Sequence, residues 1–307
     1  MKMPIRILLT VFMAAVSMLP IAADAAEGNT NEVVKVLMIG NSFSISCLTY
    51  LPQLAADCDV KLDLASLYIG GCSLETHVTN AREERKNPSA AGKYLYNRVT
   101  LNGPRKTIKE ARLTDALARA KWNVVTIQQA SHLSWKPESY EPWGDDLVAI
   151  VRELAPQAKI VVQETWSYTP FDGRLKGWKM TADEMYAKLA KAYRGFAAKR
   201  GFDVIPTGDA VQAWRRERPV QYTDHSFGGD VVGGRWQKES DHFKRNADLT
   251  WSLNSDGFHL NEKGEYLQAL VWARFVLKAD ITKPETNPAC VTLGEDKLMR
   301  RIVSELK

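Results

Sequence analysis

The feature that most constrains the fold is an alternation of short apolar runs with longer helical patterns. Apolar, mostly β-branched runs of strand length cover residues 33–39, 60–69, 122–129, 159–164 and 202–206. Helices are predicted between or after these runs, over residues 48–56, 75–86, 113–120, 145–154, 182–199 and 262–277. Repeated strand-then-helix units build a parallel sheet with helices on both faces. The sequence therefore predicts a three-layer α/β/α fold with a central parallel sheet.

Two stretches depart from this alternation. Residues 94–105 are less regular and favour an inserted hairpin. Residues 221–253 contain two glycine pairs and weak periodicity, and long irregular segments inside compact domains usually have a function or are disordered. This segment leads into Asp256-Gly257-Phe258-His259, which is discussed below as part of a candidate functional site. We therefore expect the segment to form a wall or lid of that site. Four side chains in it match no familiar metal motif, so we interpret them as parts of a solvated loop: His225, Asp230, Asp241 and His242.

The first residues have the pattern of a secretory signal peptide. A basic start is followed by a mainly apolar stretch over 7–23, and Ala23-Asp24-Ala25 supplies small residues for cleavage. A membrane anchor is the weaker interpretation, because the apolar part is short for a bilayer span. We therefore predict a signal peptide over 1–25, a single catalytic domain over 26–307 without stable membrane insertion, and export to a bacterial periplasm or the extracellular space.

Composition excludes some functions. The chain has 307 residues, of which 45% are hydrophobic, and a net charge of +5, which is enough apolar material for a large core. The basic residues are scattered, so a nucleic-acid partner is not expected. Four cysteines lack any Cys-x-x-Cys spacing, which argues against a zinc ribbon. Export permits disulfides, and the predicted strand ends favour Cys47 with Cys72 and Cys58 with Cys290; free buried thiols are the alternative.

Ser42 stands where the first apolar run ends, in Gly40-Asn41-Ser42-Phe43-Ser44. In open α/β sheets ligands bind at the carboxyl ends of the strands, so a serine here has the position of a nucleophile. The alternative is a plain turn with a helix cap, because Gly, Asn and Ser all favour turns.

Asp256 and His259 supply the other parts of a serine hydrolase. Three residues of separation allow the carboxylate to reach the imidazole Nδ1, which leaves Nε2 free to face Ser42. Considered separately, Asp256 is also explained as a helix N-cap and His259 as a histidine bonded to the backbone.

These motifs together resemble the SGNH hydrolases, also called GDSL-like esterases. The resemblance spans Gly40 to His259, with Gly-Asn-Ser in place of the commoner Gly-Asp-Ser, and is closest to a bacterial Gly-Asn-Ser-Phe-Ser branch of poorly described function. It implies a flavodoxin-like fold, a Ser42-His259-Asp256 triad, and no metal or organic cofactor.

The resemblance also implies an oxyanion hole. Its donors would be the N–H groups of Ser42 and Gly71 and, in place of the family asparagine, the Gln128 amide. A plain turn is the alternative for Gly70-Gly71. Strand alternation turns Gln128 and Gln129 to opposite sides, so only one of them can complete the oxyanion hole. Gln128 is favoured, and Gln129 is the alternative; otherwise Gln129 contacts the substrate or caps the strand. The residues predicted to contact substrate are Asn41, Gln129, Ser131, His132 and Trp166.

The substrate is less constrained by the sequence. Tryptophans in predicted loops suit sugar rings or acyl chains, although aromatic side chains usually pack in the core; these are Trp135, Trp143, Trp166, Trp178, Trp236 and Trp251. We favour a carbohydrate O-acetylesterase acting on a small-molecule or glycan ester. The alternatives are a lipase-like or thioesterase activity on longer acyl chains, and a non-catalytic glycan-binding module. The sequence does not define the oligomeric state.

Overall fold

The computed structural model describes residues 32–100, 103–218, 229–233, 243–245, 251–253, 256–283 and 287–307. The predicted signal peptide lies outside these residues. Among the described residues, no helix combines the length and apolar character needed to cross a bilayer.

A seven-stranded sheet forms the centre, in the order β4-β3-β2-β1-β5-β6-β7. The strands are β1 (Val34–Gly40), β2 (Leu62–Tyr68), β3 (Tyr94–Thr100), β4 (Lys106–Ala111), β5 (Val124–Ile127), β6 (Lys159–Gln163) and β7 (Asp203–Ile205). Neighbours in the run from β2 through β1 to β7 pair in parallel. The predicted hairpin is present as β3 and β4, which continue the sheet beyond β2 in antiparallel pairing. The sheet is therefore mostly parallel.

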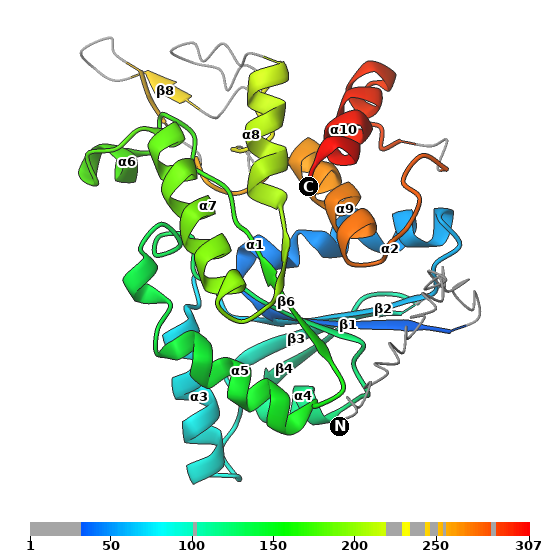
Figure 1. Ribbon diagram of the computed structural model, residues 1–307, viewed down its shortest axis with the longest axis vertical. Helices are drawn as coiled ribbons and strands as arrows, with labels where there is room; N and C mark the ends of the chain where they lie inside the picture. The colour runs from blue at the N-terminus through cyan, green and yellow to red at the C-terminus, as the bar shows by residue number, and fades with distance from the viewer. Residues whose placement is uncertain are drawn as a thin grey trace, which may run out of the picture.

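Helices cover both faces of the sheet, as Figure 1 shows. Their bounds are α1 (Ser42–Ile45), α2 (Cys47–Asp57), α3 (Leu74–Lys86), α4 (Leu113–Ala118), α5 (Trp143–Leu154), α6 (Gly173–Gly177), α7 (Ala182–Ala198), α8 (Thr207–Glu217), α9 (Glu262–Phe275) and α10 (Leu293–Glu305). On one face lie α2, α8, α9 and α10, and on the other α3, α4 and α5. Helix α7 packs closely on α5, since a methyl group on Gly144 would lie 2.3 Å from the Phe196 ring. The predicted three-layer α/β/α fold is confirmed.

The central strand explains where the polar residues gather. Residues Val36 to Ile39 of β1 are at most 1% exposed, because β2 and β5 flank the strand and helices cover it on both faces. Parallel strands end at the same edge, so the segments after β1, β2, β5 and β6 meet there. Burial of this apolar strand thus fixes the position of Ser42 at the carboxyl edge.

Four helices were not predicted from the sequence: the short helices α1 and α6, and the longer helices α8 and α10. Helix α8 follows β7 directly, and α10 has Thr292 as its N-cap, in a capping box in which Thr292 and Glu295 bond each other's backbone N–H. The Thr-x-x-Glu pattern is visible in the sequence, so α10 could have been predicted from its N-cap.

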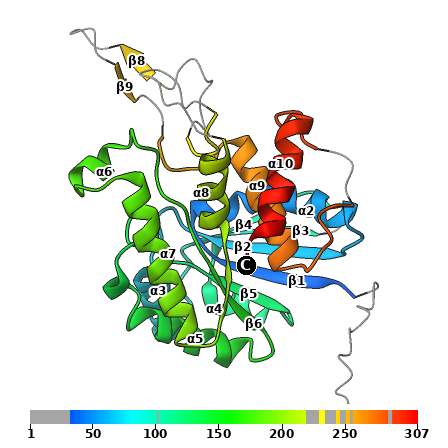
Figure 2. The same ribbon diagram turned by 45° about the horizontal axis from the view of Figure 1, so that its top comes forward.

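The segment predicted as an irregular loop contains regular structure. Strands β8 (Phe243–Arg245) and β9 (Trp251–Leu253) pair antiparallel, at the top of Figure 2. Asp230 forms a buried ion pair with Arg215 at 2.9 Å. The other three side chains considered as ligands, His225, Asp241 and His242, lie outside the described residues, within which no group of His, Cys, Asp and Glu that could hold a metal is found.

The predicted disulfides are wrong, because all four cysteines are free thiols. Cys290 Sγ lies 3.6 Å from the Tyr50 hydroxyl, and Cys72 Sγ lies 3.5 Å from Nδ1 of His77. The prediction rested only on which edge of the sheet each cysteine lies at. Two cysteines at the same edge can still be too far apart for their sulfurs to bond.

Candidate active site

The Asp256 to His259 turn is held by its own carboxylate. Asp256 Oδ1 accepts from the N–H groups of Phe258 (3.0 Å) and His259 (2.8 Å), while Oδ2 lies 2.6 Å from His259 Nδ1. Burial raises the pKa of Asp256, but the hydrogen bonds from His259 and the backbone outweigh it and leave that pKa below its usual value. The carboxylate therefore stays charged and orients the imidazole. The N-cap of α9 is Asn261, not Asp256.

The imidazole presents its second nitrogen to a pocket. His259 Nε2 is buried and has no hydrogen-bond partner among the described residues. Ser42 and His259 line the same pocket, of about 830 Å³, so the structure brings the two distant segments together. A hydrogen bond between them is not present among the described contacts. Catalytic contacts of this kind often tighten only when substrate binds.

The turn that carries Ser42 is fixed through its neighbour Phe43. The Phe43 carbonyl accepts from Gln163 Nε2 (2.9 Å), at the end of β6, and from Gln268 Nε2 (2.8 Å), in α9. Gln268 Oε1 also accepts from Ser46 at 2.7 Å. Helix α9 follows His259 directly, so these bonds tie the base-bearing segment to the serine turn. The sequence analysis missed both glutamines.

Asn41 is a structural link rather than an open donor. Its Oδ1 accepts from Phe43 N–H (3.0 Å) and Gln128 Nε2 (2.8 Å), and its Nδ2 donates to the Cys72 carbonyl (3.0 Å). An aspartate has no donor for that carbonyl. The amide at position 41 is thus matched to its surroundings, which explains Gly-Asn-Ser where the resembled family more often has Gly-Asp-Ser. Asn41 is 1% exposed, although it contributes to the pocket wall.

The two predicted glutamines differ in position. Gln128 Nε2 is bonded to Asn41, and Gln128 is not among the described residues that line the pocket. Gln129 is turned away from the pocket: its Oε1 accepts from Leu74 and Ala130 N–H, and its Nε2 donates to Ser139. The structure therefore places Gln129 in the role of an amide that caps the strand end. Both residues follow the end of β5 at Ile127, so their different partners come from the loop after the strand.

Backbone donors face the pocket at two places. Ser42 is the first residue of α1, where helical N–H groups have no intrahelical partner, and Gly71 follows β2 with a positive φ of 64°. No hydrogen bond among the described residues uses either N–H. Both residues line the pocket. These two N–H groups are therefore available to a ligand in the pocket.

The remaining predicted contacts divide into two groups. Ser131 and His132 line the pocket, and Ser131 Oγ lies 2.8 Å from the Tyr168 hydroxyl. Burial lowers the pKa of His132, and the cations Arg174 and Lys136 lower it further. Trp166 does not reach the pocket surface because it is fully buried: it stacks on Phe43 at 4.3 Å and donates to the Phe258 carbonyl at 2.8 Å. Trp166 supports the catalytic turns from behind.

One wall of the pocket was not predicted. Arg174 lies with its guanidinium carbon 3.9 Å from the Phe258 ring centre and 4.4 Å from that of Tyr168, and it pairs with Asp172. Trp178, at the end of α6, completes this aromatic wall. The isolated arginine gave no sequence signal, since its site is defined by rings from three separate segments.

Comparison with known proteins identifies a family for the chain. The parallel strand order β2-β1-β5-β6-β7 is that of a flavodoxin-like α/β fold. The chain belongs to the family described as "Domain of unknown function (DUF4886)", whose model matches residues 35–231. None of the curated proteins compared with the sequence matches it.

Solved structures extend the comparison. A DUF4886 family protein from Bacteroides uniformis is 27% identical, with a TM-score of 0.72, covering 89% of this chain and 93% of that one. A Slackia heliotrinireducens protein, provisionally described as an SGNH hydrolase, is 20% identical with a TM-score of 0.48, covering 79% and 98%. A family 3 carbohydrate esterase from Clostridium thermocellum is 11% identical with a TM-score of 0.41, covering 80% and 96%.

Proposed function

We propose that the protein is a serine esterase with Ser42 as nucleophile, His259 as general base and Asp256 as the residue that orients the base. The observation that carries this proposal is the Asp256 carboxylate at 2.6 Å from His259 Nδ1, while Nε2 remains unpartnered beside a pocket that Ser42 also lines. A buried imidazole nitrogen without a partner is costly unless a ligand or reacting group uses it. A hydroxyl that shares its pocket is the group that such a base activates.

The mechanism is acyl transfer in two steps. His259 takes the proton of Ser42 as Ser42 attacks the ester carbonyl, and Asp256 stabilises the imidazolium. The N–H groups of Ser42 and Gly71 stabilise the oxyanion. The Gln128 amide becomes the third donor when its Nε2 releases Asn41 Oδ1 and donates to the oxyanion instead. His259 then protonates the leaving alcohol. Water repeats the sequence on the acyl-enzyme and releases the acid.

For the substrate we favour a carbohydrate O-acetyl ester. Aromatic side chains of Tyr168, Trp178 and Phe258 form one wall of the pocket and suit the apolar faces of sugar rings. Export after removal of residues 1–25 would expose a catalytic domain over 26–307 to such glycans. The family 3 carbohydrate esterase and the acetyl xylan esterase among the neighbours carry this kind of activity in their names.

A fluorophosphonate probe tests the nucleophile without knowledge of the substrate. We expect labelling of the wild type at Ser42, and loss of labelling together with a fall in p-nitrophenyl acetate hydrolysis of about 10³–10⁶-fold in Ser42→Ala. Ser304→Ala is the control, because Ser304 is exposed on α10 and does not line the pocket. Labelling at Ser131, or unchanged turnover in Ser42→Ala, would overturn the proposal.

Acyl chain length tests the substrate class. A deacetylase should hydrolyse p-nitrophenyl acetate with a higher kcat/KM than the octanoate ester. The reverse order would favour the lipase-like alternative over carbohydrate deacetylation.

A further inference from the structure

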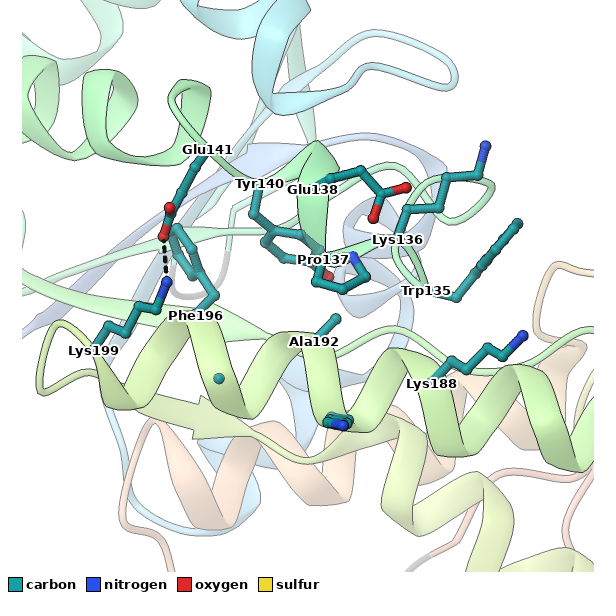
Figure 3. A pocket seen from close by; sticks show the side chains of 12 residues that line it. Trp135, Lys136, Pro137, Glu138, Tyr140, Glu141, Lys188, Ala192, Phe196 and Lys199 are labelled. Carbon is teal, nitrogen blue, oxygen red and sulfur yellow. Dashed lines mark hydrogen bonds and ion pairs between the residues drawn. The ribbon is translucent and has the colours of Figure 1, made fainter.

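A second hollow of about 550 Å³ lies beside the catalytic pocket, between residues 135–141 and α7. Figure 3 shows Trp135 to Glu141 along one side and the α7 side chains along the other. The α7 residues that line it recur three or four positions apart, so they form one face of that helix. We call this hollow the α7 groove.

The floor of the α7 groove is apolar. Tyr140, Ala192 and Phe196 contribute to it while being at most 6% exposed, and Tyr140 and Phe196 pack with ring centres 5.4 Å apart. Gly195 adds a bare stretch of helix, where a methyl group would meet nothing within 4 Å. Glycine inside a helix costs about 1 kcal/mol relative to alanine. Packing gives no reason for glycine here, so its effect is to leave the groove open.

The rim of the α7 groove has four lysines and two glutamates, Glu138 and Glu141, so lysines are in excess. Lys199 pairs with Glu141 at 3.0 Å, but Lys136, Lys188 and Lys191 have no ion pair with any described residue. Two of these ammonium groups lie at the Trp135 ring, with Lys136 Nζ at 4.9 Å and Lys188 Nζ at 5.6 Å from its centre. Figure 3 shows these two ammonium groups on opposite sides of the ring, so each face of Trp135 has a cation beside it.

A tryptophan pair links the wall of the α7 groove to the wall of the catalytic pocket, although the two hollows share no lining residue. The Trp135 ring packs against Trp178 at 5.5 Å between centres, and Trp178 lines the catalytic pocket. The chain from Ser131 and His132 in that pocket leads directly to Trp135. A polymer that places one residue near Ser42 would have to pass over this tryptophan pair to reach the groove.

We propose that the α7 groove binds the uronic acid residues of an acidic polysaccharide, whose acetylated unit lies in the catalytic pocket. This inference rests on the proposed esterase function and specifies its substrate class. Uronate rings combine apolar C–H faces, which suit the floor, with carboxylates, which suit the unpaired lysines. A neutral glycan would leave those ammonium groups without partners.

Binding is tested without turnover, in the full-length Ser42→Ala protein. Hexagalacturonate is titrated by calorimetry, alongside the same hexamer with its carboxyl groups reduced to alcohols. We expect hexagalacturonate to bind at least about tenfold more tightly than the reduced hexamer, and its affinity to fall as salt rises from about 20 to about 300 mM. Equal affinities, no binding of hexagalacturonate, or tighter binding of poly-glutamate than of hexagalacturonate would overturn the inference.

Lysine variants locate the binding. In the same Ser42→Ala background, Lys188→Gln/Lys191→Gln should weaken hexagalacturonate binding about five- to tenfold, since each exposed charge pair contributes less than about 1 kcal/mol. Lys109→Gln/Lys121→Gln is the matched control, because both lysines are exposed and lie far along the chain from α7. Equal losses in the two double variants would overturn the assignment to the groove.

Hydrolysis of p-nitrophenyl acetate by the wild type separates the two proposals. Turnover without hexagalacturonate binding keeps the esterase and rejects the uronate groove. Binding that depends on Lys188 and Lys191 without any turnover keeps the groove and rejects the esterase.

Discussion

The Ser42 turn and the α7 groove differ in how far their polar groups are bonded within the protein. Around Ser42, side-chain amides bond the N–H and the carbonyl of Phe43 and the carbonyl of Cys72, and a methyl group on Gly40 would lie 2.5 Å from Ser44 Oγ. In the groove, three of the four lysines lack ion pairs with described residues, and a methyl group on Gly195 would touch nothing. The first region holds atoms in place before any ligand arrives, as catalysis requires. The second leaves its charges to be satisfied by a partner.

Among the substitutions that compare the two regions, Asp256→Asn is expected to change activity most. An asparagine oxygen can still accept the two backbone bonds, but its amide cannot hold His259 in the tautomer that accepts a proton from Ser42. We expect kcat for p-nitrophenyl acetate to fall about 10²–10⁴-fold, with KM changed little. Exposed Asp145→Asn serves as the control. A fall smaller than threefold in Asp256→Asn would show that the base needs no orienting carboxylate.

Asn41→Asp tests whether the bonds of the Asn41 side chain require an amide at this position. The new carboxylate would face the Cys72 carbonyl with no proton to donate, in a site that is 1% exposed. We expect the free energy of unfolding at neutral pH to fall by about 3 kcal/mol. Ionisation of a buried carboxylate is the cause, so the loss should shrink as the pH falls below about 5 and the new side chain takes up a proton. Urea unfolding at several pH values measures this, and a loss independent of pH would contradict it.

Alanine at Gly40 tests how crowded the Ser42 turn is. Gly40→Ala should lower the free energy of unfolding by about 2 kcal/mol, because the added methyl forces Ser44 and Gln128 to shift. Gly294→Ala is its control, since that site has nothing within 4 Å. Equal stability of the Gly40 and Gly294 variants would show that the Ser42 turn is less crowded than its distances indicate.

Gly195→Ala is expected to give the smallest change, and of opposite sign. Alanine is the better helix former and meets no neighbour, so the free energy of unfolding should rise by about 0.5–1 kcal/mol. Thermal unfolding would record this as a higher Tm. A lower Tm would mean that the groove floor is already filled.

How much the sequence could predict follows from how local each signal is. Strand β1, the Asp256 to His259 pair and the position of Ser42 follow from apolar patterning and short spacings, and the structure brings the three side-chain positions to one edge. Helix α10 had a readable cap and was still missed.

Other features had no local signal. Gln163 and Gln268 bond the Phe43 carbonyl across 120 and 225 residues of chain, and no pattern near Phe43 indicates either. The α7 groove needs the packing of α7 against residues 135–141, which periodicity alone does not define. The choice of Gln129 as a substrate contact failed for a related reason: its partner Leu74 is 55 residues away.

The bond between Gln268 and Phe43 also bears on how the protein folds. It closes a loop of 225 residues, and pairing of such distant segments is slow because chain entropy must be lost before the contact forms. The nucleophile strand can therefore pack early, while the histidine reaches its place only when the carboxyl-terminal part of the chain docks. Until that late step the pocket that Ser42 and His259 line is incomplete, so the activity proposed for it should appear as the last event of refolding.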